Sequence, residues 1–252
     1  MSKLELEKTK TAYQIKLSDP PLNILDMAML TELRNALRHV KSDRPLLVIS
    51  AAGEKAFSAG ASVQDHTGDR IEQMLTTFHE CFRMMSRLDL VSIALVRGAA
   101  LGGGCELALA ADFVLASSKA KFGQPEIALG VFPPVAAYQL SRQVHPRRGL
   151  ELLLTGDPVD APTARELGMV NLVFDHESFD EESRRWMERL LRHSASSLRL
   201  AKKAFRIASA GDFSDRLARV EEVYLGELME TFDANEGLSA FLEKRKPAWK
   251  DE

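Results

Sequence analysis

Apolar and polar positions over the first fifty residues follow three patterns in turn. Between residues 4 and 17 apolar side chains alternate with polar ones, which predicts two strands with one face toward a core. From residue 27 to residue 40 they recur three and four positions apart, after Asp26, a residue type that caps helices. Residues 46–50 are continuously apolar, as in a strand buried on both faces. The chain therefore begins with two strands, an amphipathic helix and a buried strand.

This succession of strands and helices continues to residue 174. After a long loop, expected from residue 51 to about residue 69, helical spacing returns at residues 71–85. Further short apolar runs predict strands at residues 91–96, 113–116 and 120–122. Apolar strands separated by helices are typical of an α/β fold with a parallel sheet and right-handed crossovers.

Helical patterns dominate the rest of the chain. Three helices are expected between residues 135 and 167, followed by a last strand at residues 169–174. After that strand we expect only helices, at residues 179–191, 197–208, 213–232 and 236–244. A helical tail behind an α/β body often packs on itself or on a neighbouring subunit, and a break near Ser194 separates the two parts.

Composition and charge argue against several classes of function. A chain of 252 residues that is 45% hydrophobic can bury a full core. Its net charge of -3, without a dense basic segment, gives no reason to expect a nucleic acid partner. We also expect no membrane span and no signal peptide, because no apolar run has the required length. The two cysteines show neither metal-ligand spacing nor a disulfide framework, so we expect no metal site and a reducing cytoplasm.

The glycine run at residues 102–104 is the first candidate for a ligand site. Glycines allow a tight turn and a close approach of backbone amides to a ligand, and the helix formers after them predict a helix start. Unpaired N–H groups at such a start favour negative charge, and Glu106 lies one turn inside. The run fits an anion pocket with a built-in acid or base, but taken alone it is better explained as an ordinary glycine-capped helix.

Two other segments have a similar character. Residues 55–63 are a loop of small residues after a buried strand, where ligands bind in parallel α/β sheets. In residues 122–127, Glu126 follows a proline that fixes the local turn. Each segment alone also fits a surface loop or an acidic helix start. Asp65 and His66 are most simply solvated surface residues, and we expect no catalytic role for His66.

Together and in this order, the three segments resemble the crotonase, or enoyl-CoA hydratase/isomerase, superfamily. Residues 55–61 and 100–108 resemble its two oxyanion-hole loops, and residues 122–126 resemble the segment with the second glutamate of its hydratases. Further matches extend the resemblance over nearly the whole chain, at residues 154–157, 164–170 and 239–247.

The resemblance implies a fold and an assembly. The fold is an α/β spiral of repeated ββα turns that form two nearly perpendicular sheets. Residues 1–194 would form this core with an acyl-CoA site, and residues 195–252 a C-terminal helical region that joins subunits. The expected assembly is a homotrimer or a homohexamer built as a dimer of trimers. No bound cofactor is implied, because coenzyme A arrives as part of the substrate.

The resemblance also implies roles for individual residues. The thioester oxygen of an acyl-CoA would lie between the N–H groups of Ala61 and Gly103, which stabilise its charge as an enolate forms. Glu106 would activate water, and Glu126 would hold the water and exchange a proton with carbon, although the sequence leaves open which is the base. Contacts to coenzyme A are expected from a set of small or basic residues, Lys55, Ala59, Ala61 and Val63.

Residues 60–62 and 132–138 differ from common short-chain hydratases, and residues 57–66 and 130–134 resemble the cyclohexa-1,5-diene-1-carbonyl-CoA hydratases. Prolines fix the backbone here, and a stiffer apolar wall suits a ring better than a flexible chain. The implied reaction adds water to the conjugated diene and gives 6-hydroxycyclohex-1-ene-1-carbonyl-CoA. The residues expected to form this wall of the acyl pocket are Phe132, Pro133, Pro134 and Val135.

Two alternatives stay open. One is a general enoyl-CoA hydratase that acts on linear short-chain substrates. The other is a protein of the same fold that binds acyl-CoA or RNA without turnover, against which stand both glutamates and the acidic charge balance.

Overall fold

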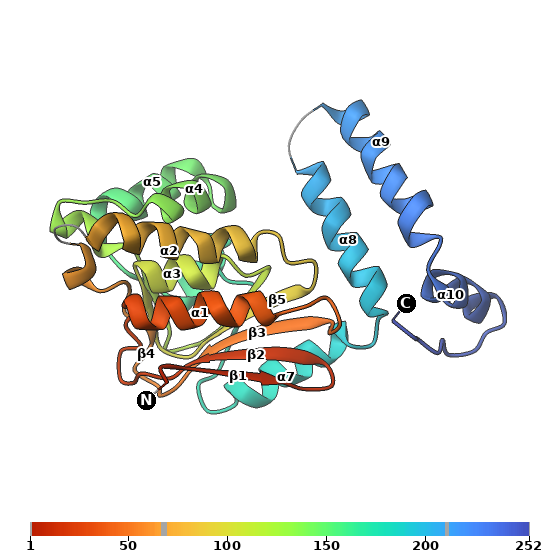
Figure 1. The fold of residues 1–252 in the computed structure, drawn as a ribbon, viewed down its shortest axis with the longest axis horizontal. Coiled ribbons are helices and arrows are strands. Elements are labelled where there is room, and N and C mark those ends of the chain that lie inside the picture. Colours follow the sequence, from red (N-terminus) through yellow and green to blue (C-terminus); the bar gives the residue numbers. More distant parts are fainter. Residues whose placement is uncertain (1, 67–69, 210–211, 252) are drawn as a thin grey trace.

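Six strands form the larger of two sheets in the computed structural model, which describes residues 2–66, 70–209 and 212–251 (Figure 1). β1 pairs with β2 in antiparallel register, with Leu4 opposite Leu17, and β2 and the later strands are parallel. The patterns of alternating and continuous apolar residues predicted all six strands, with a wrong start only for the last. In spatial order they are β1 (Leu4–Lys8), β2 (Ala12–Leu17), β3 (Leu46–Ala51), β5 (Val91–Val96), β7 (Phe113–Ser117) and β10 (Leu172–Phe174).

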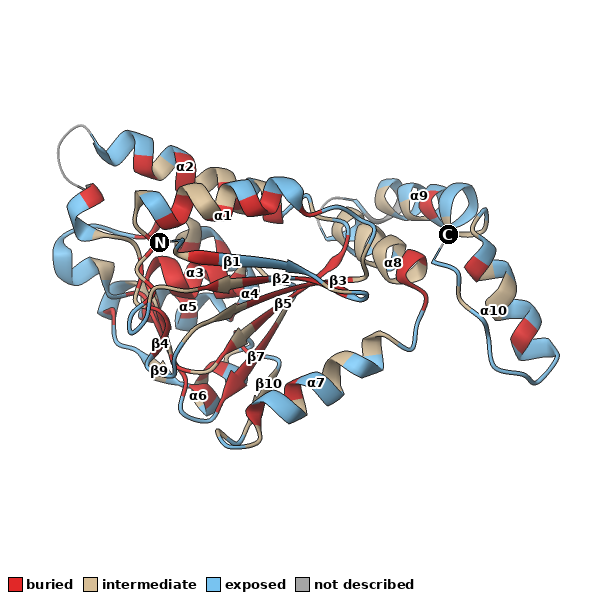
Figure 2. Cartoon of the chain, turned by 60° about the horizontal axis from the view of Figure 1, so that its bottom comes forward, coloured by how far each residue is buried: buried red, intermediate tan, exposed pale blue. Residues whose placement is uncertain are grey.

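Four short strands form a second sheet at one end of the body, where Figure 2 labels β4 and β9. β4, β6 and β8 are parallel, and each is the next strand after β3, β5 and β7 respectively. Helical segments then return the chain to the larger sheet, so successive ββα turns build the body. This repeat confirms the α/β spiral. In spatial order the strands are β4 (Ala56–Ser58), β6 (Ala99–Leu101), β8 (Lys121–Gly123) and β9 (Val159–Asp160).

Some predicted boundaries in the body are wrong. Residues 51–66, expected as loop, contain β4 and a 3₁₀ helix, η1 (Val63–His66), while residues 67–69 of that loop lie outside the described residues. Strands as short as β4 and β9 give no periodic signal. The strand expected from residue 169 begins only at β10, because the Met169 N–H donates to Ala164 O at 2.9 Å and closes helix α6 (Ala161–Glu166).

Helices cover both faces of the larger sheet (Figure 1). On one face lie α1 to α5, and on the other lies α7 (Phe179–Leu190). Asp26 caps α1 as predicted, its side chain accepting from the Met29 N–H at 2.9 Å. The helices of the first face are α1 (Met27–His39), α2 (Arg70–Met85), α3 (Gly103–Leu109), α4 (Pro134–Gln143) and α5 (Pro146–Thr155).

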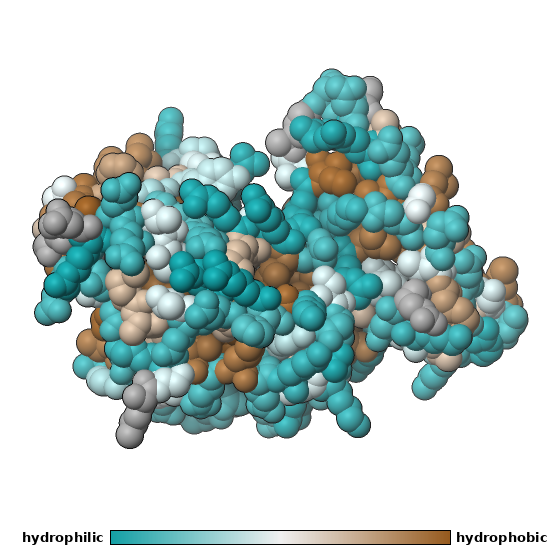
Figure 3. Space-filling view, viewed as in Figure 1, coloured by the Kyte–Doolittle hydropathy of each residue, from teal (hydrophilic) through white to brown (hydrophobic). Residues whose placement is uncertain are grey.

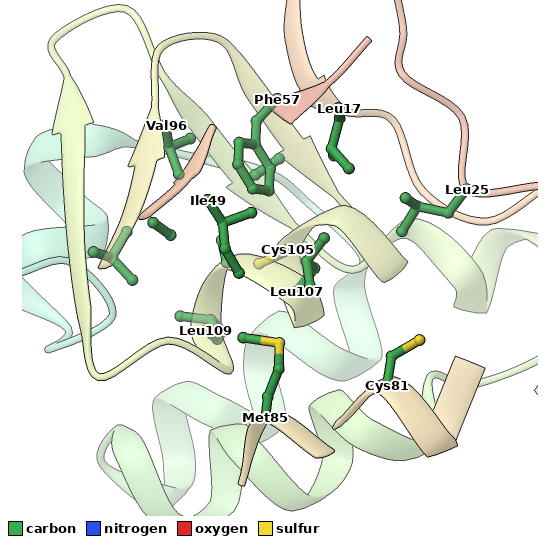
Figure 4. Close-up of a cluster of buried hydrophobic side chains, with 14 of the residues drawn as sticks. Leu17, Leu25, Ile49, Phe57, Cys81, Met85, Val96, Cys105, Leu107 and Leu109 are labelled. Atoms are coloured by element: carbon green, nitrogen blue, oxygen red, sulfur yellow. The ribbon is translucent and has the colours of Figure 1, made fainter. Parts of the chain in front are cut away.

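Helix α3 lies inside the main hydrophobic core. All seven of its residues are buried, and Figure 4 shows Cys105, Leu107 and Leu109 among side chains from the sheets and from α2. A helix enclosed in this way cannot shift without disturbing a closely packed interior. The core therefore fixes the backbone position of every residue that α3 contributes.

The C-terminal helices lie beside the body as a separate layer (Figure 1). Ser194 caps α8 (Ala195–Ala208) through the Ser197 N–H, and α9 (Phe213–Val223) runs back along it. The helix expected at residues 213–232 ends too late, and the one expected at residues 236–244 begins too late. α9 passes into a π-helical segment, η3 (Tyr224–Leu228), and Thr231 then caps a separate α10 (Phe232–Leu242). No helix in the described part of the chain is long and apolar enough to cross a membrane.

Candidate active site

The carboxyl ends of three neighbouring parallel strands of the small sheet lead directly into the predicted site segments. β4 is followed by Ala61, β6 by Gly103 and Glu106, and β8 by Glu126. Because parallel neighbours end at the same edge of a sheet, residues far apart in sequence meet there. The structure thus brings together the four residues for which the sequence predicted chemistry.

The glycine run converts β6 into the start of α3. Gly102 has φ +51°, in the region that favours glycine, and its N–H donates to Gly123 O on β8 at 2.9 Å. The first helical bond runs from the Glu106 N–H to Gly102 O, so the first-turn amides, including that of Gly103, have no acceptor within the helix. The backbone here presents N–H groups that the helix leaves without an acceptor, as the sequence predicted.

The loop after β4 places a second amide beside the first. Leu25 hydrogen-bonds to the residues on either side of Ala61, accepting from the Ser62 N–H at 3.3 Å and donating to Gly60 O at 2.9 Å. This pairing does not use the N–H of Ala61. A Cβ built on Gly103 would lie 3.3 Å from Ala61 N, so the two amides share one small space.

Phe78 on α2 closes one side of this space. A Cβ on Gly103 would also lie 3.0 Å from Phe78 Cζ, and Phe78 is itself buried. The sequence identified Phe78 only as part of a helical stripe, because nothing in its spacing shows which buried side chain borders a site. An aromatic wall here excludes water from the two amides, which strengthens their interaction with charge.

Glu106 is buried and held by the start of α4. Only 2% of its surface is exposed, and its Oε1 accepts from the Ala136 N–H at 2.6 Å. The Gln139 side chain, one turn further along α4, donates to the backbone oxygen of Glu106 at 3.0 Å. Sequence reasoning missed both contacts, which join segments some thirty positions apart.

Burial raises the pKa of Glu106 to about 8. The N–H groups of Ala136 and Val135 oppose this shift, since hydrogen bonds to the charged form lower a carboxyl pKa, and the nearby charge of Glu126 adds to it. A carboxyl group with a pKa near neutrality can take up and release a proton at physiological pH.

Glu126 lies directly against the glycine run. It is half-buried in the 3₁₀ helix η2 (Pro125–Leu129), and a Cβ on Gly102 would come within 2.5 Å of its Oε1. Only glycine at position 102 allows the carboxylate this close. Two carboxyl groups and two amide N–H groups therefore surround the N-terminus of α3, an arrangement able to polarise a carbonyl and move a proton.

The residues predicted to bind coenzyme A all lie on the segment that contains β4. Lys55 and Val63 are exposed at its two ends, while Ala59 and Ala61 are half-buried between them. The Lys55 carbonyl also accepts from the Ala99 N–H at 3.1 Å, which ties this segment to β6. Their exposure leaves them accessible to a ligand, and contact with coenzyme A stays a prediction.

The residues predicted as the acyl wall have different environments. Phe132 is 63% exposed, Pro133 is buried, and Pro134 is exposed as the first residue of α4. Val135 is half-buried and borders a cavity of about 750 Å³ between the body and α8. Figure 3 shows hydrophobic side chains in the recess between these two parts.

Comparison with known proteins gives a consistent family. The sequence matches the profile described as "Enoyl-CoA hydratase/isomerase" over residues 7–252. It is 38% identical to cyclohexa-1,5-dienecarbonyl-CoA hydratase of Thauera aromatica, over 99% of this chain and 96% of that protein. It is 36% identical to crotonyl-CoA hydratase of Syntrophomonas wolfei, over 96% of this chain and 95% of that protein.

Solved structures agree with the sequence relatives. An enoyl-CoA hydratase from Geobacillus kaustophilus superposes with a TM-score of 0.94 at 28% identity, covering 100% of this chain and 98% of that one. An enoyl-CoA hydratase from Bacillus anthracis gives a TM-score of 0.93 at 31% identity, covering 99% of this chain and all of that one. The chain thus belongs to the enoyl-CoA hydratase/isomerase family and is a hydro-lyase of the enoyl-CoA hydratase type.

Proposed function

We propose that the protein adds water to cyclohexa-1,5-diene-1-carbonyl-CoA and forms 6-hydroxycyclohex-1-ene-1-carbonyl-CoA. The proposal of hydration rests on one observation above all, the buried Glu106 beside Glu126 at the glycine start of α3. The neighbouring amides of Ala61 and Gly103 supply the other half of the site. No metal and no cofactor other than the coenzyme A of the substrate takes part in the proposed reaction.

In the proposed reaction the two amides bind the thioester oxygen. The oxygen of water bonds to the carbon β to the thioester carbonyl. An electron pair then moves through the conjugated system onto the thioester oxygen. Fixed N–H donors stabilise this charge, and removal of a single donor of this kind costs roughly 3 to 4 kcal/mol in activation free energy. The N–H groups of Ala61 and Gly103 need no side chain for this role.

The two glutamates handle the protons. Glu106 takes a proton from water, and Glu126 holds the water and delivers a proton to a ring carbon, so one water molecule is added overall. Proton transfer by a positioned side chain contributes about 100 to 10,000-fold to a rate.

We expect Glu106→Gln and Glu126→Gln each to lower kcat at least a hundredfold while the protein stays folded. Unchanged turnover in both variants contradicts this mechanism.

The cyclic substrate is supported by the relative from Thauera aromatica and by the proline-rich entry to α4. The test compares kcat/KM for the cyclic dienoyl-CoA and for crotonyl-CoA on one preparation. We expect a preference for the ring. The second candidate, hydration of linear enoyl-CoA, is supported by the similar identity to crotonyl-CoA hydratase of Syntrophomonas wolfei, and a preference for crotonyl-CoA establishes it instead.

We also propose that the chain acts in the cytoplasm as a homotrimer or homohexamer, without nucleic acid or membrane partners. The C-terminal helices expose large apolar side chains that a subunit contact would cover, including Phe205 at 77% exposed, Phe241 at 82% and Leu242 at 79%. Light scattering on the wild type should give three or six times the mass of one chain. A Phe241→Ser and Leu242→Ser double variant should shift the mass toward the single chain.

A further inference from the structure

The segment after β4 is attached to the N-terminus of α1 by consecutive hydrogen bonds. The Ala59 N–H donates to Leu22 O at 2.9 Å, and Leu25 pairs with the residues flanking Ala61. The next attachment is made by a side chain: Asp65 Oδ2 accepts from the Met27 N–H, the first amide of α1, at 3.2 Å. The segment from Ala59 to Asp65 is thus attached at both ends, at Ala59 to Leu22 before α1 and at Asp65 to the first amide of α1.

Asp65 is not the solvated surface residue that the sequence suggested. It is 8% exposed, and its own N–H donates to Ser62 O at 3.1 Å within η1. Arg70 lies 3.8 Å from the carboxylate, but the arginine side chain is 69% exposed, so this ion pair contributes little. Among the residues that the structure describes, the main partner of the buried carboxylate is therefore the positive end of α1.

Helix α1 is a rigid support for this contact. Met29, Leu30, Leu33 and Leu37 are all buried in the main core. Asp26, the residue directly before α1, already caps the helix by accepting a hydrogen bond from the Met29 N–H. Asp65 adds a second acceptor to the same helix end, but it does so from the segment that contains Ala61.

We propose that Asp65 is a positioning residue that holds the amide N–H of Ala61 in register with that of Gly103. This inference rests on the proposed function of the two amides. Without the Asp65 contact the segment keeps its bonds to Leu22 and Leu25 but loses its attachment beyond Ser62, so the direction of the Ala61 N–H can change relative to α3, which the core holds fixed. Stabilisation by N–H donors depends on their exact direction, so the damage falls on the transition state more than on substrate binding.

The structure supplies a pair of variants that break the same contact from opposite sides. Asp65→Ala removes the acceptor. Met27→Pro removes the donor, and proline is tolerated at the first position of a helix, after Asp26 with its extended φ of -81° and ψ of 173°. Met27→Ala controls for the lost side chain. Asp26→Ala controls for the loss of a cap on α1, together with the Asp26 ion pair to Lys3, and leaves the Asp65 contact to the Met27 N–H in place.

We expect Asp65→Ala and Met27→Pro each to lower kcat about tenfold or more, with little change in KM. This loss of kcat should be smaller than the roughly 100-fold or greater loss expected when an oxyanion donor is deleted. The double variant should be no worse than either single variant, because both remove one contact. Asp65→Asn, which keeps an acceptor oxygen, should recover part of the rate. Asp26→Ala and Met27→Ala should lower the melting temperature without a comparable loss of kcat.

A spectroscopic measurement reports how strongly the two amide N–H groups polarise a bound carbonyl. The absorption of bound 4-(dimethylamino)cinnamoyl-CoA moves to longer wavelength when its carbonyl oxygen is polarised by hydrogen bonds. We expect a smaller shift in Asp65→Ala than in Asp26→Ala. An equal shift, or an equal loss of kcat in the two variants, overturns the proposal because it reduces Asp65 to a stabilising cap.

Amide hydrogen exchange separates this inference from the proposed function. Exchange over residues 59–65 should be faster in Asp65→Ala and Met27→Pro than in the two control variants, whichever substrate is turned over. If the wild type hydrates no enoyl-CoA, the proposed function fails, while unchanged exchange in this segment refutes the attachment itself.

Discussion

At the scale of single residues, Glu106 shows how burial prepares an ordinary side chain for chemistry. Its pKa of about 8 results mainly from the loss of water around the carboxylate, only partly offset by the N–H groups at the start of α4. The sequence showed that a carboxylate follows the glycine run. It could not show the burial, because Ala136 and the core that enclose Glu106 come from distant parts of the chain.

The proposed role of Glu106 as the base predicts a pH dependence of rate. The ionised form accepts the proton of water, so kcat/KM for hydration should rise with pH through about 8 as Glu106 ionises in the free enzyme. Dehydration of the product should follow the same profile, because the reaction takes up and releases no net proton. A hydration rate that falls through this range assigns the role of acid to Glu106.

The same group makes stability depend on pH. Its pKa in the folded state lies above the ordinary value of 4.5, so between about pH 4.5 and 8 the unfolded chain has lost a proton that the folded chain keeps. The contribution of Glu106 to stability is therefore greatest below pH 4.5 and is lost as pH rises toward 8. Glu106→Gln cannot ionise, so its melting temperature relative to the wild type should increase steadily from pH 5 to pH 8. A constant difference contradicts the raised pKa.

At the scale of elements, α3 and β4 are joined by contacts that tolerate no added atom. A Cβ on Gly104 would lie 2.3 Å from the backbone oxygen of Ser58. We expect Gly104→Ala to destabilise the fold by about 1 to 3 kcal/mol, the usual range for overpacking, and to lower activity by separating the two amides. Chemical denaturation and the rate of hydration measure the two effects.

Gly226 provides the matched control. It lies in η3, and an added Cβ would meet no atom within 4 Å among the described residues. Gly226→Ala should therefore leave stability unchanged or raise it, since alanine is the better helix former. Equal destabilisation in both variants excludes the close contact between α3 and β4 as its cause.

Helices and strands were predicted correctly where the apolar pattern within the segment itself is clear. Strands of five or six residues and helices with a clear apolar stripe, such as β5 and α2, agree with the expected ranges. β4 and β9 were missed because two or three residues show no period. The break between the last two helices was placed too late, at Asp233, because Thr231 marks the start of α10 only through its hydrogen bond to the Ala234 N–H.

At the scale of the whole molecule, the sequence predicted the fold but only the components of the site. Gly103, Glu106 and Glu126 were identified from motifs within single segments. The contact between Asp65 and Met27 joins positions 38 apart, and the cavity between the body and α8 involves residues from Phe82 to Arg206. Such features depend on how distant segments pack, and no local pattern encodes them.

Hydratase activity should be among the last properties to return when the unfolded chain refolds. The edge at which β4, β6 and β8 end exists only after three successive ββα turns have closed, and closing long loops slows folding. Helical circular dichroism, which reflects local contacts, should recover earlier. The return of turnover therefore reports that the entire body has folded, and a partly folded chain should show no hydratase activity.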